Sequence, residues 1–242
     1  MLNAESNSPA TTTTVGDIVA SSAVVSSPQK GGEQSIAFSI FTNSLRRAKN
    51  LIDIDTAKDK TKLQIEEENL NDAYRASIVL SISALDAYVR VFVLDRIKDL
   101  LKKQQLPQAL KDYIKKDLFP NKETFHGIVF EPDFYKKIED AFNKDFEKQS
   151  FQGQRNIAVY MKIAGYEDIF RKISRNADKS ADNLQTNIEK YTQRRHDIVH
   201  CGDHDLGQVD ITENKIDKQD AQKCIQLVEF IAEQIHQISI QK

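Results

Sequence analysis

Apolar residues recur every three or four positions along most of the chain after residue 34, which is the spacing of one face of an α-helix. The strongest pattern runs from about Glu66 to Lys103, and its apolar stripe is wide enough to predict a central helix contacted on several sides. Strand-like alternation occurs only briefly, around Val209 and Ile211. We therefore expect an all-α protein. The other predicted helices start near Ser35, span Glu131–Lys148, run from about Ser180 to His200, and start near Asp217.

Residues 1–33 differ in composition from the rest of the chain. They hold ten Ser/Thr residues but only four charged side chains. Such a segment cannot bury enough apolar surface to offset its ordering entropy, so we predict a disordered tail over 1–33. Residues 34–242 then form one helical domain with equal numbers of acidic and basic residues, 33 of each. Within it, residues 104–165 are interrupted by prolines and are predicted only as a helical insertion of uncertain role.

Composition excludes several classes of protein. No stretch approaches the roughly 18 uncharged apolar residues of a spanning helix, so we expect no membrane insertion. The first residues lack the basic and apolar regions of a secretory signal, and two cysteines cannot form a disulfide framework, so we expect a cytoplasmic protein. The sequence has no phosphate-cradling glycine loop and no dinucleotide fingerprint, so we expect no cofactor.

The helix that ends near His200 carries an unusual charge. Its apolar stripe continues through the position of Arg195, which places a guanidinium in the middle of a buried face. That side chain either meets a ligand or partner, or reaches the edge of the face, or pairs with a carboxylate such as Asp86. Asp86 can equally pair with Arg90, four residues further along its own helix. The apolar residues that surround Arg195 in this stripe are Leu184, Ile188, Tyr191 and Ile198.

Two segments of the chain resemble the HEPN superfamily of helical RNA-cleaving and nucleotide-associated domains. RHDIVH resembles its signature, with Arg195 and His200 as the defining residues, and SISALDAYVRVFVLDRI resembles a helix of its RiboL-PSP branch. Cys201 stands where many members have glycine. The resemblance implies an HEPN-like bundle and a metal-independent endoribonuclease that acts as a homodimer. It also implies a prokaryotic toxin or antiviral effector, with a possible neutralising protein partner.

The residue types in this motif suit that chemistry. Cleavage by the RNA 2′-hydroxyl needs a base, an acid and positive charge against the phosphate. His200 can serve as acid or base, and Arg195 can bind phosphate. His196 could orient His200 or hold phosphate, or could simply face solvent. Asp197 could fix the tautomer of an imidazole, or could be surface charge.

A composite site between two subunits is favoured by helix geometry. Residues five apart on an α-helix, such as Arg195 and His200, are turned by about 140° and separated by about 7.5 Å. One copy therefore does not aim both at one phosphate, whereas two antiparallel motif helices in a two-fold dimer would supply two arginines and two histidines.

A basic segment leads into the motif and is a candidate RNA-binding surface. Residues 171–195 carry a net charge of +4, and Arg175, Lys190 and Arg194 are its predicted RNA contacts. Residues 95–122 also carry +4, which could equally be a solvated helix face.

Two other functions use the same window. His196, His200, Cys201 and His204 could be zinc ligands, although neither a cysteine pair nor an adjacent glutamate accompanies them. A non-catalytic helical module could instead bind RNA, a nucleotide or a protein through the same surface.

Overall fold

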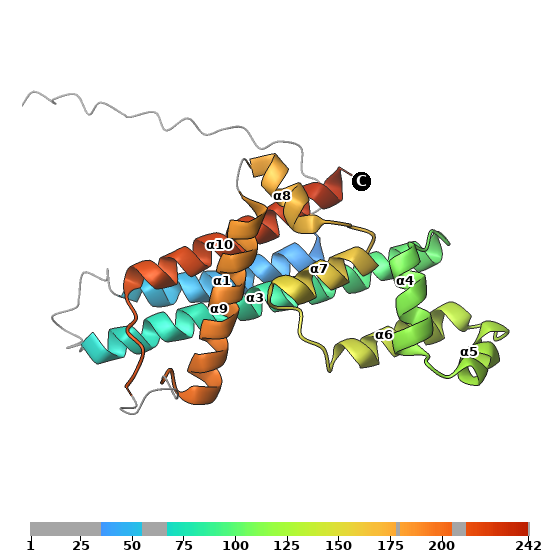
Figure 1. Ribbon diagram of the computed structural model, residues 1–242, viewed down its shortest axis with the longest axis horizontal. Helices are drawn as coiled ribbons and strands as arrows, with labels where there is room; N and C mark the ends of the chain where they lie inside the picture. The colour runs from blue at the N-terminus through green and yellow to red at the C-terminus, as the bar shows by residue number, and fades with distance from the viewer. Residues whose placement is uncertain (1–34, 55–66, 178–179, 205–211, 242) are drawn as a thin grey trace, which may run out of the picture. The chain divides into compact units, whose positions relative to one another are not determined.

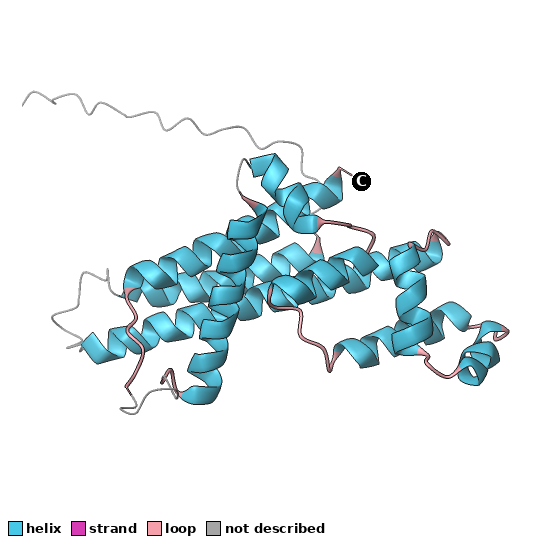
Figure 2. Cartoon of the chain, in the orientation of Figure 1, coloured by secondary structure: helices cyan, strands magenta, loops and turns pink. Residues whose placement is uncertain are grey.

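The computed structural model describes residues 35–54, 67–177, 180–204 and 212–241. Helices make up the secondary structure of these residues, and no strand occurs among them (Figure 2). Among the same residues, one isolated backbone bridge joins His204 to Glu213. The predicted all-α class is confirmed. The predicted tail over 1–33 and the alternation around 209–211 lie outside the described residues.

Helix α3 (Glu67–Lys102) is the central element, as its wide apolar stripe predicts. Helices α1 (Ile36–Asp53) and α10 (Lys218–Ile240) lie along it, and each also contacts the other (Figure 1). Ser77 on α3 is fully buried, and its hydroxyl is satisfied because it donates to the carbonyl oxygen of Ala48 on α1, at 3.0 Å. The three helices thus form the core layer of the fold.

By length and composition alone, α3 is long and apolar enough to cross a membrane. More than half of its most apolar window, 56%, is buried inside the protein. Helices α1, α6, α7, α9 and α10 all contact it. Its hydropathy is therefore explained by its place as the core helix.

The ends of three helices form at the residues that the sequence indicates. Ser35, Ser180 and Asp217 are the N-caps of α1, α9 (Ala181–Cys201) and α10, and each side chain accepts a backbone N–H of the first turn. Gly202 ends α9 in the left-handed conformation, with φ of 60°.

The segment over 104–165 is helical, contacts α3 through α6 and α7, and is joined internally by aromatic side chains. The predicted helix over Glu131–Lys148 is shorter, because residues 131–133 form turns before α6. The elements are α4 (Gln108–Tyr113), a π-helical turn η2 (Ile114–Leu118), α5 (Lys122–Val129), α6 (Phe134–Phe146) and α7 (Gln154–Ile163). Neighbouring aromatic rings join α4, α6, α7 and the loop before α7, namely Tyr113, Phe142, Phe146, Phe151 and Tyr160.

Helix α9 crosses the bundle steeply, over α3 and α10 (Figure 1). Its N-terminal half also contacts α8 (Ile169–Ala177), and α7 contacts it as well. The stripe residues Leu184, Ile188 and Tyr191 are buried, and Ile198 packs against the core. This crossing places the last two turns of α9 beside both α3 and the loop before α7.

Candidate functional site

Arg195 lines a polar pocket between α9, α3 and the loop before α7. The pocket has a volume of about 240 Å³. The side chain is partly buried, and its Nε is a buried donor without a hydrogen-bond partner among the described residues. Because buried donors are normally paired, the unmatched Nε makes Arg195 a candidate binding residue.

Asp86 lines the same pocket but does not neutralise Arg195. Its Oδ1 accepts the backbone N–H of Phe151 at 2.7 Å, and its Oδ2 lies 3.5 Å from Nη2 of Arg90. The helix-surface pairing with Arg90 is therefore the one that forms. No ion pair joins Asp86 to Arg195 in the described parts of the chain.

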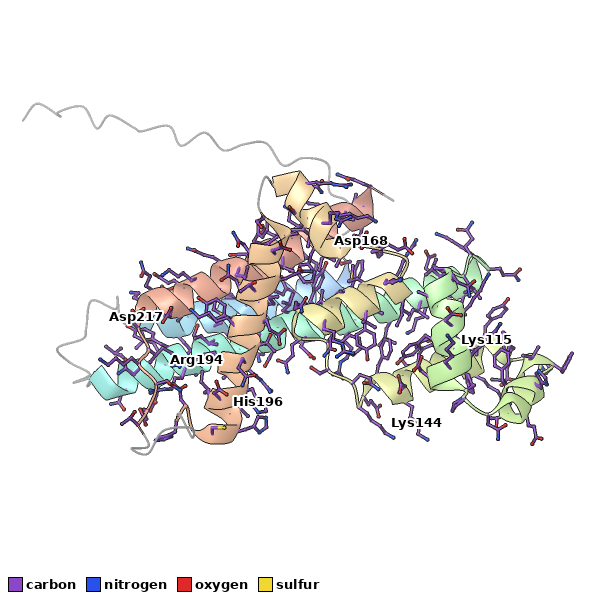
Figure 3. The ribbon with its side chains drawn as sticks, viewed as in Figure 1. Lys115, Lys144, Asp168, Arg194, His196 and Asp217 are labelled. Atoms are coloured by element: carbon purple, nitrogen blue, oxygen red, sulfur yellow. The ribbon has the colours of Figure 1, made fainter. Side chains whose placement is uncertain are left out.

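His196 and His200 lie side by side at the end of α9. Both are exposed, and their ring centroids are 4.6 Å apart at an angle of 42°. Figure 3 shows His196 directed away from the bundle, on the side opposite Arg194. Because α9 remains a regular helix to Cys201, Arg195 and His200 are turned away from each other within one chain.

Arg194 has a different environment from its neighbour Arg195. Its Nη2 donates to Oδ2 of Asp203 at 2.8 Å and to the carbonyl oxygens of Asn214 and Lys215. These bonds hold the end of α9 to the segment that leads into α10. About a fifth of the side chain, 21%, is still exposed, so its contact with RNA stays a prediction.

Asp203 is a structural residue that the sequence did not single out. Its side chain is 1% exposed, and its Oδ2 accepts Nε of Arg75 on α3 and Nη2 of Arg194, both at 2.8 Å. Burial alone would lower the pKa of Arg75, but Asp203, Asp72 and Glu213 together raise it above its ordinary value. The charged pair therefore ties the end of α9 to α3. In the sequence, Asp203 stands out only as an acidic residue directly after a helix-ending glycine, and this position does not predict which residues it pairs with.

Asp197 has bonds that maintain the helix end. Its carboxylate accepts from the side chain of Gln193 at 2.8 Å, and its backbone carbonyl accepts the N–H groups of Gly202 and Asp203. No hydrogen bond links it to an imidazole among the described residues. Its role in fixing a tautomer stays a prediction.

The two remaining predicted RNA contacts, Lys190 and Arg175, precede the motif in the sequence. Lys190 is exposed, and its Nζ lies 5.5 Å from the ring centroid of Tyr191. It lines an open hollow of about 630 Å³ together with Gln154 and Gln193. Arg175 is exposed in the last turn of α8.

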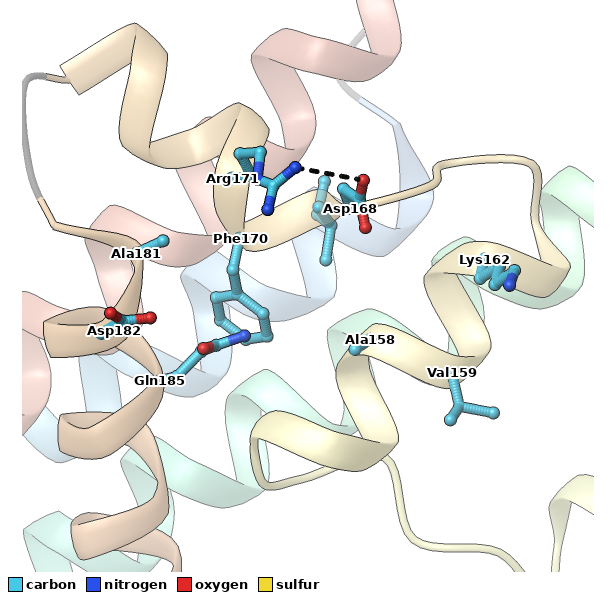
Figure 4. A pocket seen from close by; sticks show the side chains of 10 residues that line it. Ala158, Val159, Lys162, Asp168, Phe170, Arg171, Ala181, Asp182 and Gln185 are labelled. Carbon is cyan, nitrogen blue, oxygen red and sulfur yellow. Dashed lines mark ion pairs between the residues drawn. The ribbon is translucent and has the colours of Figure 1, made fainter.

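A second hollow, of about 310 Å³, lies between α7, α8 and α9 (Figure 4). Lys162 and Arg171 line it together with two aspartates, Asp168 and Asp182, and Arg171 lies 4.0 Å from Asp168. This hollow and the one beside Lys190 share Asp182 and Gln185. Together they extend along α9 towards the motif.

The described residues do not form the ligand set that the zinc alternative requires. No group of three or more histidine, cysteine or acidic side chains there is arranged to hold a metal ion. Nδ1 of His204 instead lies 3.2 Å from the carbonyl oxygen of Cys201.

A sequence model of the RiboL-PSP-HEPN family matches residues 42–238, which is most of the chain. The chain belongs to the RiboL-PSP-HEPN family. The resemblance drawn from RHDIVH and the central helix is thereby confirmed, and RiboL-PSP-HEPN membership suggests ribonuclease activity. No curated protein and no solved structure matches the chain.

Proposed function

We propose that this RiboL-PSP-HEPN protein is a metal-independent endoribonuclease. The observation that carries the proposal is the buried, unpartnered Nε of Arg195, on the same helix end as the exposed pair His196 and His200. A guanidinium with an unmatched Nε supplies fixed positive charge, and the two imidazoles on the same helix end are side chains that can act as acid or base. Family membership supports RNA as the substrate.

The reaction uses the nucleophile that RNA itself carries. One histidine takes the proton of the 2′-hydroxyl, whose oxygen forms a bond to the adjacent phosphorus. The P–O5′ bond breaks, a second imidazole protonates the leaving 5′-oxygen, and the products carry a 2′,3′-cyclic phosphate and a 5′-hydroxyl. Arg195 stabilises the charge that builds up on the phosphate in the transition state. We assign His200 to proton transfer, and His196 either shares that role or orients His200.

Two copies of the chain are proposed to build the complete site. Arg195 faces its own α3, whereas His200 faces outward, so a second α9 brought alongside would present its histidines to the first subunit's arginine. Val199, next to His200, is an apolar residue that is 46% exposed and would be covered in such a dimer. A cytoplasmic toxin or antiviral effector held in check by a neutralising protein is the biological role that accords with this chemistry.

The test is RNA cleavage by purified protein in excess chelator. Arg195→Ala and His200→Ala are each expected to lower the cleavage rate by about 10²–10⁴-fold, the usual contribution of general acid–base catalysis or transition-state charge. Arg47→Ala and His126→Ala are matched controls, because both side chains are exposed and lie outside the motif and outside the basic segment 171–195. Undiminished cleavage by the two motif variants would refute the assignment.

The same assay separates the alternatives. Loss of cleavage in chelator would favour a zinc enzyme, and RNA binding without any cleavage would favour a non-catalytic module. The dimer is tested separately by light scattering. A mass near that of one chain, 27.6 kDa, at the concentration of the assay would contradict the composite site.

A further inference from the structure

The pocket beside Arg195 is built from three separate segments of the chain. Helix α3 supplies one wall, the loop before α7 supplies the second, and α9 supplies the third. The loop belongs to the segment 104–165, whose contribution the sequence does not reveal. The lining residues are Ser83, Asp86 and Arg90 from α3, Gln149, Ser150 and Gln152 from the loop, and Arg195 from α9.

Two residues that line this pocket each carry one polar atom without a hydrogen-bond partner among the described residues. One is Nε of Arg195, and the other is Oγ of Ser150, and both atoms are buried. Because buried polar atoms are normally paired, two unmatched atoms on residues that line one cavity point to a ligand that meets both side chains.

The other polar groups of the pocket are already engaged. Arg90 donates to the carbonyl oxygen of Gln149 at 3.0 Å, lies 3.5 Å from Asp86, and its guanidinium carbon lies 5.2 Å from the ring centroid of Phe151. Oδ1 of Asp86 is held by the N–H of Phe151. Arg90 is therefore fixed in place, and its charge faces the same cavity as that of Arg195.

The charge and size of the pocket favour a phosphate group. Two guanidiniums and one carboxylate leave the lining with a net positive charge, and an arginine fork matches phosphate oxygens. A volume of about 240 Å³ lies below that of a pocket for a drug-sized ligand, roughly 300–1,000 Å³. The pocket accommodates one phosphodiester with part of its sugars.

We infer that this pocket seats the RNA phosphodiester that Arg195 grips, with Ser150 donating a hydrogen bond to it and Arg90 supplying a second positive charge. This inference rests on the proposed function and extends it to the loop before α7. Ser150 and Arg90 then contact the substrate, and the role of this part of the inserted segment is to form one wall of the substrate site.

The test measures binding of a single-stranded RNA oligonucleotide whose 2′-hydroxyls are methylated. Such RNA lacks the nucleophile, so its affinity is measured by fluorescence anisotropy whether or not the protein cleaves RNA. If the cleavage assay fails, this binding result still stands, and if the pocket fails, the cleavage result still stands. Circular dichroism melts of every variant confirm that it is folded.

Ser83 allows a charge-reversal experiment, because its side chain is exposed on α3 and borders the pocket. Ser83→Glu is expected to weaken binding by about tenfold at low salt, since it places a negative charge beside the phosphate. Ser83→Lys is expected to bind at least as tightly as the wild type. Thr124→Glu on α5, an exposed position outside the pocket, is the control for net charge.

Two further variants test the unmatched atoms themselves. Ser150→Ala removes one hydroxyl and is expected to weaken binding by about tenfold, the value of a hydrogen bond to a charged group. Arg195→Met keeps the bulk of the side chain and should lower the slope of log affinity against log salt by about 0.7, the loss of one phosphate contact on a single strand. Equal affinities for Ser83→Glu and Ser83→Lys, or an unchanged affinity for Ser150→Ala, would overturn the inference. Displacement of the labelled RNA by millimolar mononucleotide, without displacement by an unlabelled RNA strand, would likewise overturn the inference in favour of a nucleotide site.

Discussion

The charged contact between Asp203 and two arginines is expected to be the most sensitive point of the motif helix. Asp203 is almost fully buried, and its Oδ2 accepts from Arg75 and Arg194 at 2.8 Å each. It also has a φ of 62°, a left-handed conformation that asparagine and glycine adopt more readily than alanine. Three substitutions at this one position therefore separate the loss of charge from the backbone cost.

The magnitudes follow from these contacts. Removing one partner of a buried ion pair costs about 3–5 kcal/mol, but Arg75 would keep Asp72 and Glu213, which places the loss near the lower end. Asp203→Asn keeps the shape and the acceptor oxygen, so its loss should be about 2 kcal/mol. Asp203→Gly loses the whole contact, about 3 kcal/mol, and Asp203→Ala adds about 1 kcal/mol because its Cβ disfavours the left-handed conformation.

The measurement is urea unfolding followed by far-ultraviolet circular dichroism, which gives the free energy of unfolding of each variant. Asp168 is a matched control, because it also has a positive φ, of 50°, yet its side chain is 74% exposed and its one ion pair within the described ranges is with Arg171, at 4.0 Å. Asp168→Asn should leave stability nearly unchanged, and Asp168→Ala should cost only the backbone contribution. A loss below about 0.5 kcal/mol for Asp203→Asn, or equal losses for the two Asn variants, would refute the reasoning, since changes of that size are typical of surface sites.

Three other results are expected from single positions. Gly202→Ala should lower stability by about 1 kcal/mol in the same urea assay, because Gly202 has a φ of 60°. Burial lowers the pKa of His236, which stacks on Phe38, so as the pH falls the unfolded chain binds this proton before the folded chain does. The free energy of unfolding should therefore decrease as the pH drops below about 6.5. His236→Phe should make this decrease smaller in melts recorded at several pH values. Burial raises the pKa of the Cys224 thiol, so a thiol reagent should label the partly exposed Cys201 in the folded protein and Cys224 only after unfolding; rapid labelling of both would contradict the packing of α10.

The parts of the fold that the sequence predicts are those set by local signals. Ser35, Ser180 and Asp217 cap their helices as a serine or aspartate before an apolar repeat should, and Gly202 ends α9. The central helix ends at Lys102, one residue before its predicted limit. In each case the deciding interaction lies within one turn of the chain, so the residue types alone are sufficient.

The segment 104–165 and the ion pairs of the site depend on contacts between distant residues. Tyr113 and Phe151 are brought together by Phe146, and the apolar spacing of each short helix gives no sign of that meeting. Arg75 lies 128 positions before Asp203, so no local pattern could join them. The contacts of Asp86 are predicted only in part. The i,i+4 spacing predicts its pairing with Arg90, but only the position of the loop shows that the N–H of Phe151 supplies the second bond.

The adjacent arginines at the end of α9 have different hydrogen-bond partners. Arg194 donates to a buried carboxylate and two carbonyl oxygens, so its positive charge is already balanced by the fold. Arg195, one position later and turned by about 100°, borders a pocket in which its buried Nε has no partner among the described residues. Stability alone would favour pairing or replacing such a donor, because an unmatched buried group costs free energy. In the proposed function, the free energy that the fold gives up at Arg195 is regained when the phosphate binds, which is the arrangement that preorganised catalytic sites use.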